Sequence, residues 1–170
     1  MPNIPTKPKY ETRQVAINII EDYYNPTVML PALYFHINPQ EFKMDYRKII
    51  HRYKTFTAHV EEYWGDELDT ISCDGSTGGF LTEDFGLDAI NRKTSKPFFK
   101  FQDILDVYRN NGNIYNSSGQ VIRKGSVVIF FDPGTYYGYF ENFSYIETAD
   151  NPFRFIFNFT FKVQRSYNGV

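Results

Sequence analysis

Cysteine is almost absent from this sequence of 170 residues, in which Cys73 stands alone. A single cysteine excludes an intrachain disulfide framework and any zinc site that is built from several cysteines. It is consistent with synthesis in a reducing compartment. We therefore interpret Cys73 as a small, buried apolar residue.

Neither sign of charge is in large excess. The sequence has 18 Lys and Arg and 20 Asp and Glu, which gives a formal charge of −2. Contacts to phosphates need clustered Lys and Arg, so no specific nucleic-acid binding is expected. Long apolar runs are also missing, and the stretch at residues 127–131 is far too short to cross a bilayer. The first five residues lack the basic and apolar layout of a signal peptide. We expect a soluble protein that is made in the cytoplasm and has no membrane partner.

Aromatic residues are abundant instead, at 19% of the chain, with 17 Phe and 14 Tyr. The length favours one domain, since single domains usually have roughly 100–200 residues. We predict a single β-rich domain over residues 14–165. An extended, proline-rich arm over residues 1–13 precedes it, and a short tail over residues 166–170 follows.

Alternating apolar residues predict mostly strands, and so a mainly β (α+β) fold. The clearest strand is residues 153–163, where five Phe and Val163 share one face. Residues 55–64 alternate too, which predicts one buried face and one wet or partnered face. One helix is predicted at about 97–110, capped by Thr94 or Ser95. A weaker helix is possible at residues 82–90.

The densest group of chemically active side chains is Asp66, Glu67 and Asp69, beside Trp64. One interpretation is a glycosidase-like acid pair, with Trp64 stacking on a sugar. The other is a surface turn whose acids pair with neighbours, which we favour. The spacing does not match a calcium-binding EF-hand loop.

Other candidate sites are weaker. The glycine-rich residues 74–79 lack the Lys of a phosphate-binding loop, so a tight turn is the better interpretation. His51 and His59 could approach each other across a hairpin, but no Cys or spaced carboxylate completes a zinc site. Cys73 with a His could form a nucleophile–base pair, although the residues alone do not favour it. We expect no cofactor, no metal and no enzymatic activity.

Residues 136–146 carry aromatics on both faces. Alternation would set Tyr136, Phe140 and Ile146 on one face, which can enter the core of the chain. The opposite face then needs cover from another layer or another subunit. We favour another subunit, because aromatics are enriched at the centres of protein interfaces. The residues assigned to this interface are Trp64, Asp66, Glu67, Tyr137, Tyr139, Phe143 and Tyr145.

Two groups of motifs resemble those of a known class of proteins. The first comprises FHINP at residues 35–39, YWGDELDTIS at 63–72 and GSTGGF at 75–80. The second comprises YGYFENFSY at 137–145 and NPFRFIFNFTFKV at 151–163. Together, over residues 33–163, they resemble small structural proteins of tailed-bacteriophage tails and baseplates.

This resemblance implies an antiparallel β-sandwich or barrel-like domain of the tail-tube type, with one flanking helix. Proteins of this kind form rings, often six-fold, around the tail channel and connect the tube to the baseplate. The partners would be copies of the chain and other tube and hub proteins, and the location would be the virion. Distal tail, tube-initiator and baseplate-adaptor types all remain open. The alternative is a carbohydrate-binding module that uses Trp64 and exposed tyrosines.

Overall fold

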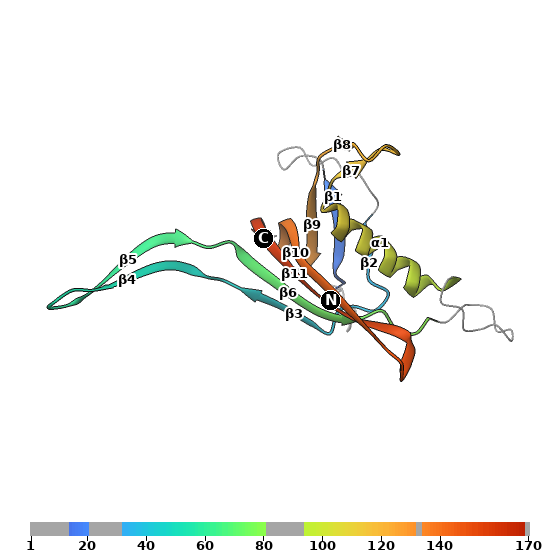
Figure 1. The fold of residues 1–170 in the computed structure, drawn as a ribbon, viewed down its shortest axis with the longest axis horizontal. Helices are drawn as coiled ribbons and strands as arrows, with labels where there is room; N and C mark the ends of the chain where they lie inside the picture. Colours follow the sequence, from blue (N-terminus) through green and yellow to red (C-terminus); the bar gives the residue numbers. More distant parts are fainter. Residues whose placement is uncertain (1–13, 21–31, 81–93, 132–133, 169–170) are drawn as a thin grey trace, which may run out of the picture.

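The computed structural model describes residues 14–20, 32–80, 94–131 and 134–168. Figure 1 shows an elongated molecule, in which a body of sheet and helix carries a long two-stranded hairpin. The predicted arm over residues 1–13 and the possible helix at residues 82–90 lie outside the described residues. In the described part of the chain, no helix is long and apolar enough to span a membrane.

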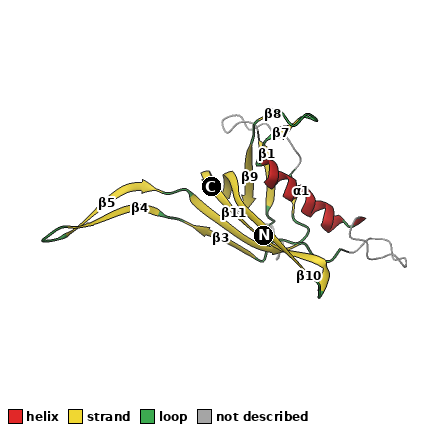
Figure 2. Ribbon diagram, viewed as in Figure 1, coloured by secondary structure: helices red, strands yellow, loops and turns green. Residues whose placement is uncertain are grey.

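The described residues form one helix and three antiparallel sheets (Figure 2), which confirms the predicted mainly β fold. The elements are β1 (Ala16–Ile20), β2 (Leu33–Tyr34), β3 (Glu41–Asp45), β4 (Lys48–Lys54), β5 (His59–Asp66), β6 (Asp69–Ser76), α1 (Lys96–Asn110), β7 (Ile114–Tyr115), β8 (Val121–Arg123), β9 (Ser126–Phe131), β10 (Gly134–Thr148) and β11 (Asn151–Asn168). The main sheet has the order β2-β1-β9-β10-β11-β6-β3, while β4 pairs with β5 and β7 with β8.

The main sheet curls until its two edges approach each other, as in a barrel. Strands β2 and β3 lie at opposite edges, yet only residues 35–40 connect them. Phe42 of edge strand β3 stacks on Phe131 of β9, with ring centroids 4.1 Å apart. Phe35, which follows edge strand β2, stacks on Phe157 of the interior strand β11 at 5.2 Å. The sheet therefore has the barrel-like form of the predicted domain.

The Phe side chains of β11 form the core, as their strict alternation predicts. Phe155, Phe157, Phe159 and Phe161 are each at most 2% exposed. Only Phe153, near the start of the strand, is half exposed. Helix α1 covers these rings with its apolar side, and its buried residues include Phe101 and Ile104.

Helix α1 begins and ends almost where the sequence predicts. Ser95 is the N-cap and Pro97 lies in the first turn, whose N–H groups have no partner within the helix. Asn111 ends the helix in a left-handed conformation, with φ 46°, and its N–H donates to the carbonyl oxygen of Val107. The predicted stop is thus confirmed, and Ser95 takes the predicted N-cap position, although its side chain forms no capping hydrogen bond.

Strand β10 does not follow the simple alternation predicted for residues 136–146. Its register against β11 shifts between Phe140 and Asn142, which leaves Glu141 as a bulge. A bulge adds one residue to a strand, so Phe140 and Phe143 come to face the core together. The assignment of Phe143 to an outer face is therefore wrong, and so is that of Ile146 to the core face, since Ile146 is 59% exposed.

Strand β11 continues further than predicted. It pairs with β10 up to Asn168, which lies opposite Gly134. Residues 166–168 therefore belong to the main sheet and not to a separate tail. The boundary was missed because the apolar alternation ends at Val163, although the backbone pairing continues.

Candidate subunit interface

The projecting hairpin, residues 48–66, is exposed on both of its faces. Every residue of β4 and β5 is exposed except Gly65, which is half-buried. The alternation at residues 55–64 predicts a buried face, and this prediction is wrong for the chain taken alone. The strand also begins later than predicted, because Thr55 and Ala58 close a turn through a backbone bond of 2.8 Å and two side-chain bonds.

Strand pairing divides the hairpin side chains into two groups, since opposed residues share a face. Ile50 lies opposite Tyr63, and Tyr53 lies opposite Val60. Trp64 is the extra residue of a bulge in β5, because Gly65 lies opposite Ile49 and Tyr63 lies opposite Ile50. Gly65, the next residue, has φ +118°, a backbone conformation that favours glycine. The aromatic face comprises Ile49, His51, Tyr53, Val60 and Glu62 by register, together with Trp64, which contacts His51 and Glu62. The charged face comprises Lys48, Ile50, Arg52, Lys54, His59, Glu61, Tyr63 and Asp66.

Ion pairs organise the charged face. Lys48 forms an ion pair with Asp66, and the hydroxyl of Tyr63 donates to Asp66 Oδ1 at 2.6 Å. Further along, Arg52 Nε lies 2.9 Å from Glu61 Oε1. Hydrogen bonds from Lys48 and then Tyr63 hold the pKa of Asp66 below its ordinary value. This face is therefore internally paired and suited to contact with water.

The aromatic face is held in place by its own contacts. The His51 and Trp64 rings meet edge to face at 5.1 Å, and Trp64 Nε1 donates to Glu62 Oε2 at 3.2 Å. Trp64 is nevertheless 65% exposed, and Tyr53 is 48% exposed. Phe56, in the turn between the strands, is fully exposed. Large exposed apolar surfaces of this kind mark interaction sites.

The three acids of the sequence motif meet at the root of the projecting hairpin. A cleft of about 340 Å³ is lined by Asp66, Glu67 and Asp69, and by Lys48 and Arg165. Burial, and then the charge of Asp66, raises the pKa of Asp69. The Glu67 N–H donates to the Arg47 carbonyl oxygen at 3.0 Å, which closes the root of the hairpin.

The remaining candidate sites are not assembled. His51 lies opposite Glu62 and His59 opposite Lys54, so the two histidines are on different faces of the hairpin. Cys73 is buried in β6, and burial raises the pKa of its thiol. Among the described residues, no group of three His, Cys, Asp or Glu side chains could hold a metal ion.

The aromatic interface residues of β10 have different environments. Tyr137 is buried against Ile20 and Val128, and Tyr139 is half-buried. Tyr145 is 47% exposed and packs on Phe101 and Phe155 within its own chain. The exposed residues of the predicted interface are therefore Trp64, Asp66, Glu67 and Tyr145.

The sequence interpretation missed Ile49, Tyr53 and Phe56 as surface residues. Their signal was the same alternation of apolar and polar side chains that usually marks a half-buried strand. Nothing in that pattern says whether the cover comes from the same chain or from another molecule.

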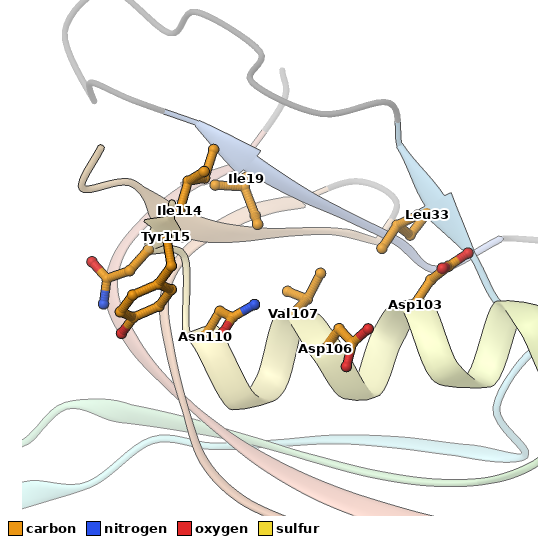
Figure 3. A pocket seen from close by; sticks show the side chains of 9 residues that line it. Ile19, Leu33, Asp103, Asp106, Val107, Asn110, Ile114 and Tyr115 are labelled. Atoms are coloured by element: carbon orange, nitrogen blue, oxygen red, sulfur yellow. The ribbon is translucent and has the colours of Figure 1, made fainter. Parts of the chain in front are cut away.

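A second cavity, of about 550 Å³, lies between α1 and the strands β1, β2 and β7 (Figure 3). Val107, Ile19 and Leu33 give it apolar walls, and α1 adds Asp103 and Asp106. Arg109 pairs with Asp106 at 3.4 Å, which partly neutralises this acid. The residues that line it include no cysteine or histidine.

No protein-family model matches the sequence, and no curated protein matches it either. Solved structures to which this chain is similar include the PVC sheath/tube terminator of an extracellular contractile injection system. It shows 10% identity and a TM-score of 0.41, with 96% of this chain and 98% of that chain covered. The cap of the anti-feeding prophage, a tube-terminating cap, shows 8% identity and a TM-score of 0.41, with 98% and 94% covered.

The SPP1 Dit protein, described as part of the hub adsorption apparatus of phages that infect Gram-positive bacteria, shows 13% identity and a TM-score of 0.48. It covers 91% of this chain, but this chain spans about half of that protein, 52%. At these identities and TM-scores the likeness establishes neither a shared family nor a shared function. The structural neighbours named here are thus components of phage tails and contractile injection systems.

Proposed function

We propose that this chain is a non-enzymatic structural subunit of a phage tail or baseplate, which assembles with copies of itself into a ring around the tail channel. In this role it connects the tail tube to the baseplate, and its other partners are tube and hub proteins in the virion. The motifs at residues 35–39, 63–72, 75–80, 137–145 and 151–163 support the tail assignment through their resemblance to tail and baseplate proteins. The same resemblance supports a six-fold ring.

The observation that carries the assembly is the projecting hairpin. An isolated two-stranded hairpin is at best marginally stable in water, because it has no second layer to cover its apolar side chains. Here Tyr53, Phe56 and Trp64 are all about half exposed or more. Burial of apolar surface stabilises by roughly 25 cal/mol per Å², so cover from a neighbouring molecule would order the hairpin. A second subunit supplies this cover in the proposed ring.

The acids at the hairpin root suit a structural role better than catalysis. Glycoside hydrolysis needs two carboxyl groups on opposite sides of a bound sugar. Asp66 is exposed and already engaged by Lys48 and Tyr63. We propose that the paired charges at this root hold the hairpin at its angle to the body.

Carbohydrate binding by Trp64 and neighbouring tyrosines is less well supported. Successive residues of a strand point to opposite faces. Tyr63 lies on the charged face and Trp64 on the aromatic face, so the two rings do not form one platform for a sugar.

Removal of the projecting hairpin tests the proposed function. The Glu67 N–H already bonds to the Arg47 carbonyl oxygen, so residues 48–66 can be replaced by a short glycine-rich turn without displacing β3 or β6. Sedimentation velocity over a range of micromolar concentrations should show that the full chain forms a discrete oligomer. The shortened variant should stay monomeric and keep its thermal unfolding transition. A full chain that remains monomeric, alone and with the tail-tube protein of the same phage, would contradict the proposal.

A further inference from the structure

The proposed function leaves open what covers the aromatic face of the projecting hairpin. We propose that the proline-rich arm of the neighbouring copy, residues 1–13, binds along this face as a polyproline II helix. This inference rests on the proposed ring assembly, to which it adds the segment that crosses from one subunit to the next.

The prolines of the arm are three residues apart, at Pro2, Pro5 and Pro8. Each proline fixes its own φ at about −65° and favours extended or polyproline II backbone in the residue before it. A polyproline II helix has three residues per turn, so residues three apart share one edge of the helix. The spacing of the prolines therefore matches this helix.

The other two edges of such a helix differ in polarity. With three residues per turn, Ile4, Lys7 and Tyr10 form the second edge, and Asn3, Thr6 and Lys9 form the third. Two edges of the helix are thus largely apolar, and the third is polar. The helix is suited to lie on an apolar surface with its polar edge towards water.

The aromatic face of the hairpin presents a row of rings that suits this segment. The His51 ring stacks on Tyr53 with centroids 6.5 Å apart and meets the Trp64 ring at 5.1 Å. Proline-rich segments bind surfaces that are lined with exposed aromatic rings. One turn of a polyproline II helix covers about 9 Å, so prolines one turn apart can contact neighbouring rings of the row.

The charges on the two binding surfaces are complementary. Among the described residues that form the aromatic face, Glu62 carries the one carboxylate, and it is exposed. Its Oε2 accepts a hydrogen bond from Trp64 Nε1, which is a neutral donor, so the carboxylate keeps its negative charge. Residues 1–10 contain Lys7 and Lys9 and no Asp or Glu. Lys7 lies on an apolar edge of the proposed helix, where it can meet Glu62 while the rest of that edge contacts the rings.

The prolines also argue against binding at a strand edge. An added strand donates backbone N–H groups from alternate residues, and proline has no such group. Pro2 and Pro8 interrupt one of the two possible registers, and Pro5 interrupts the other. Contact with the side chains of a face needs no backbone donors, so the arm is suited to the face of the hairpin.

The neighbouring copy supplies the arm in this arrangement. The arm leads into β1, which lies beside α1 in the body, whereas β4 and β5 project from the body (Figure 1). Cover by the arm of the same chain would leave each hairpin without a contact to the next subunit, which the proposed ring needs.

Cross-linking tests which chain supplies the arm, and the buried thiol of Cys73 leaves a low background. Thr6→Cys marks the polar edge of the arm, and Val60→Cys marks the aromatic face at a site that is 43% exposed. A mixture of the two single variants, treated with a short bismaleimide, should give covalent dimers that Val60→Cys alone does not give. A link that forms only within the chain of the double variant would overturn binding to the next copy.

Neighbouring acids of β5 give a matched pair of substitutions. Glu62→Lys and Glu61→Lys make the same charge change on the aromatic face and on the charged face. Glu62→Lys should weaken association about tenfold in sedimentation velocity, because it opposes Lys7, and adding Lys7→Glu to the same chain should restore it. Glu61→Lys should change association much less. Equal effects, or no rescue by Lys7→Glu, would overturn the contact.

A change of proline spacing separates this inference from the proposed function. Pro5→Ala/Thr6→Pro keeps three prolines in the arm but breaks their period of three, so it should also weaken association several-fold. An oligomer that is unaffected by this change and by Lys7→Glu would overturn the arm contact, while the ring function stands. Absence of assembly in the wild-type chain would overturn both.

Discussion

The side-chain amide of Asn111 forms both hydrogen bonds of a strand partner with the backbone of Phe140. Asn111 Nδ2 donates to the Phe140 carbonyl oxygen at 3.1 Å, and the Phe140 N–H donates to Asn111 Oδ1 at 2.9 Å. Strand β9 pairs with β10 only as far as Gly138, so Asn111 takes over where β9 no longer reaches. One residue thus ends helix α1 and fastens it to the sheet.

Asn111→Gly isolates this pair of hydrogen bonds, because glycine keeps the left-handed backbone that φ 46° requires. Each partly buried bond contributes about 0.5–1.5 kcal/mol, so unfolding in urea should show a loss of about 1–3 kcal/mol. Asn111→Ala should lose more, since it adds backbone strain. A stability of Asn111→Gly equal to that of the wild type would contradict the role of the amide.

A pair of identical substitutions separates the core from the projecting hairpin. Phe159 is 1% exposed and packs against Phe140 at 5.2 Å, whereas Phe56 is fully exposed. Phe159→Ala should cost about 3–5 kcal/mol of unfolding free energy. Phe56→Ala should change monomer stability by less than about 0.5 kcal/mol. Chemical denaturation of dilute protein measures both, and a large effect of Phe56→Ala would mean that the hairpin packs on its own chain.

The thiol of Cys73 should be protected in the native protein. Cys73 is 1% exposed, and burial, followed by the charge of Asp74, raises its pKa. Since the thiolate is the reactive form, a thiol reagent at pH 8 should modify it only after unfolding. The control is the same reaction in denaturant, where modification should be complete. Rapid modification of the native protein would show that β6 opens readily.

The carboxyl group of Asp69 should make stability depend on pH. Burial and the charge of Asp66 raise its pKa in the folded state, so folding favours the protonated form. The contribution of this group is therefore fully present below the ordinary carboxyl pKa of about 4 and is lost as the pH rises through the raised value.

Asp69→Asn should consequently raise the melting temperature at pH 7, and its advantage over the wild type should disappear at low pH. Asp66→Asn is the matched control, because it removes the ion pair with Lys48 and should bring no such gain. A lower melting temperature for Asp69→Asn at pH 7 would contradict the direction of the pKa.

Strand β11 and helix α1 of the body could be predicted, because the sequence patterns that indicate them lie within a single element. The Phe alternation of β11 and the apolar spacing of α1 both arise from the geometry of one element. The side on which Phe143 lies could not be predicted, since the bulge at Glu141 leaves no mark in the apolar pattern. Curling of the sheet, which brings Phe42 to Phe131, depends on packing between distant segments.

The candidate interface was only partly predictable. Trp64, Asp66 and Glu67 do lie at an exposed hairpin, but alternation alone assigned residues 55–64 to a half-buried strand. The turn at residues 55–58 contains neither Gly nor Pro, so it gave no turn signal. Apolar alternation indicates a face that needs cover, and only the structure reveals that the chain itself does not provide it.

Electron microscopy of the purified chain, alone and with the tail-tube protein, tests whether the chain forms a ring through its hairpin. We expect closed rings with an open central channel, in which the projecting hairpin of each subunit contacts its neighbour. Their disappearance in the variant that lacks residues 48–66 would link the rings to the hairpin. Particles of single-chain size under both conditions, or closed two-fold dimers without a channel, would contradict the account.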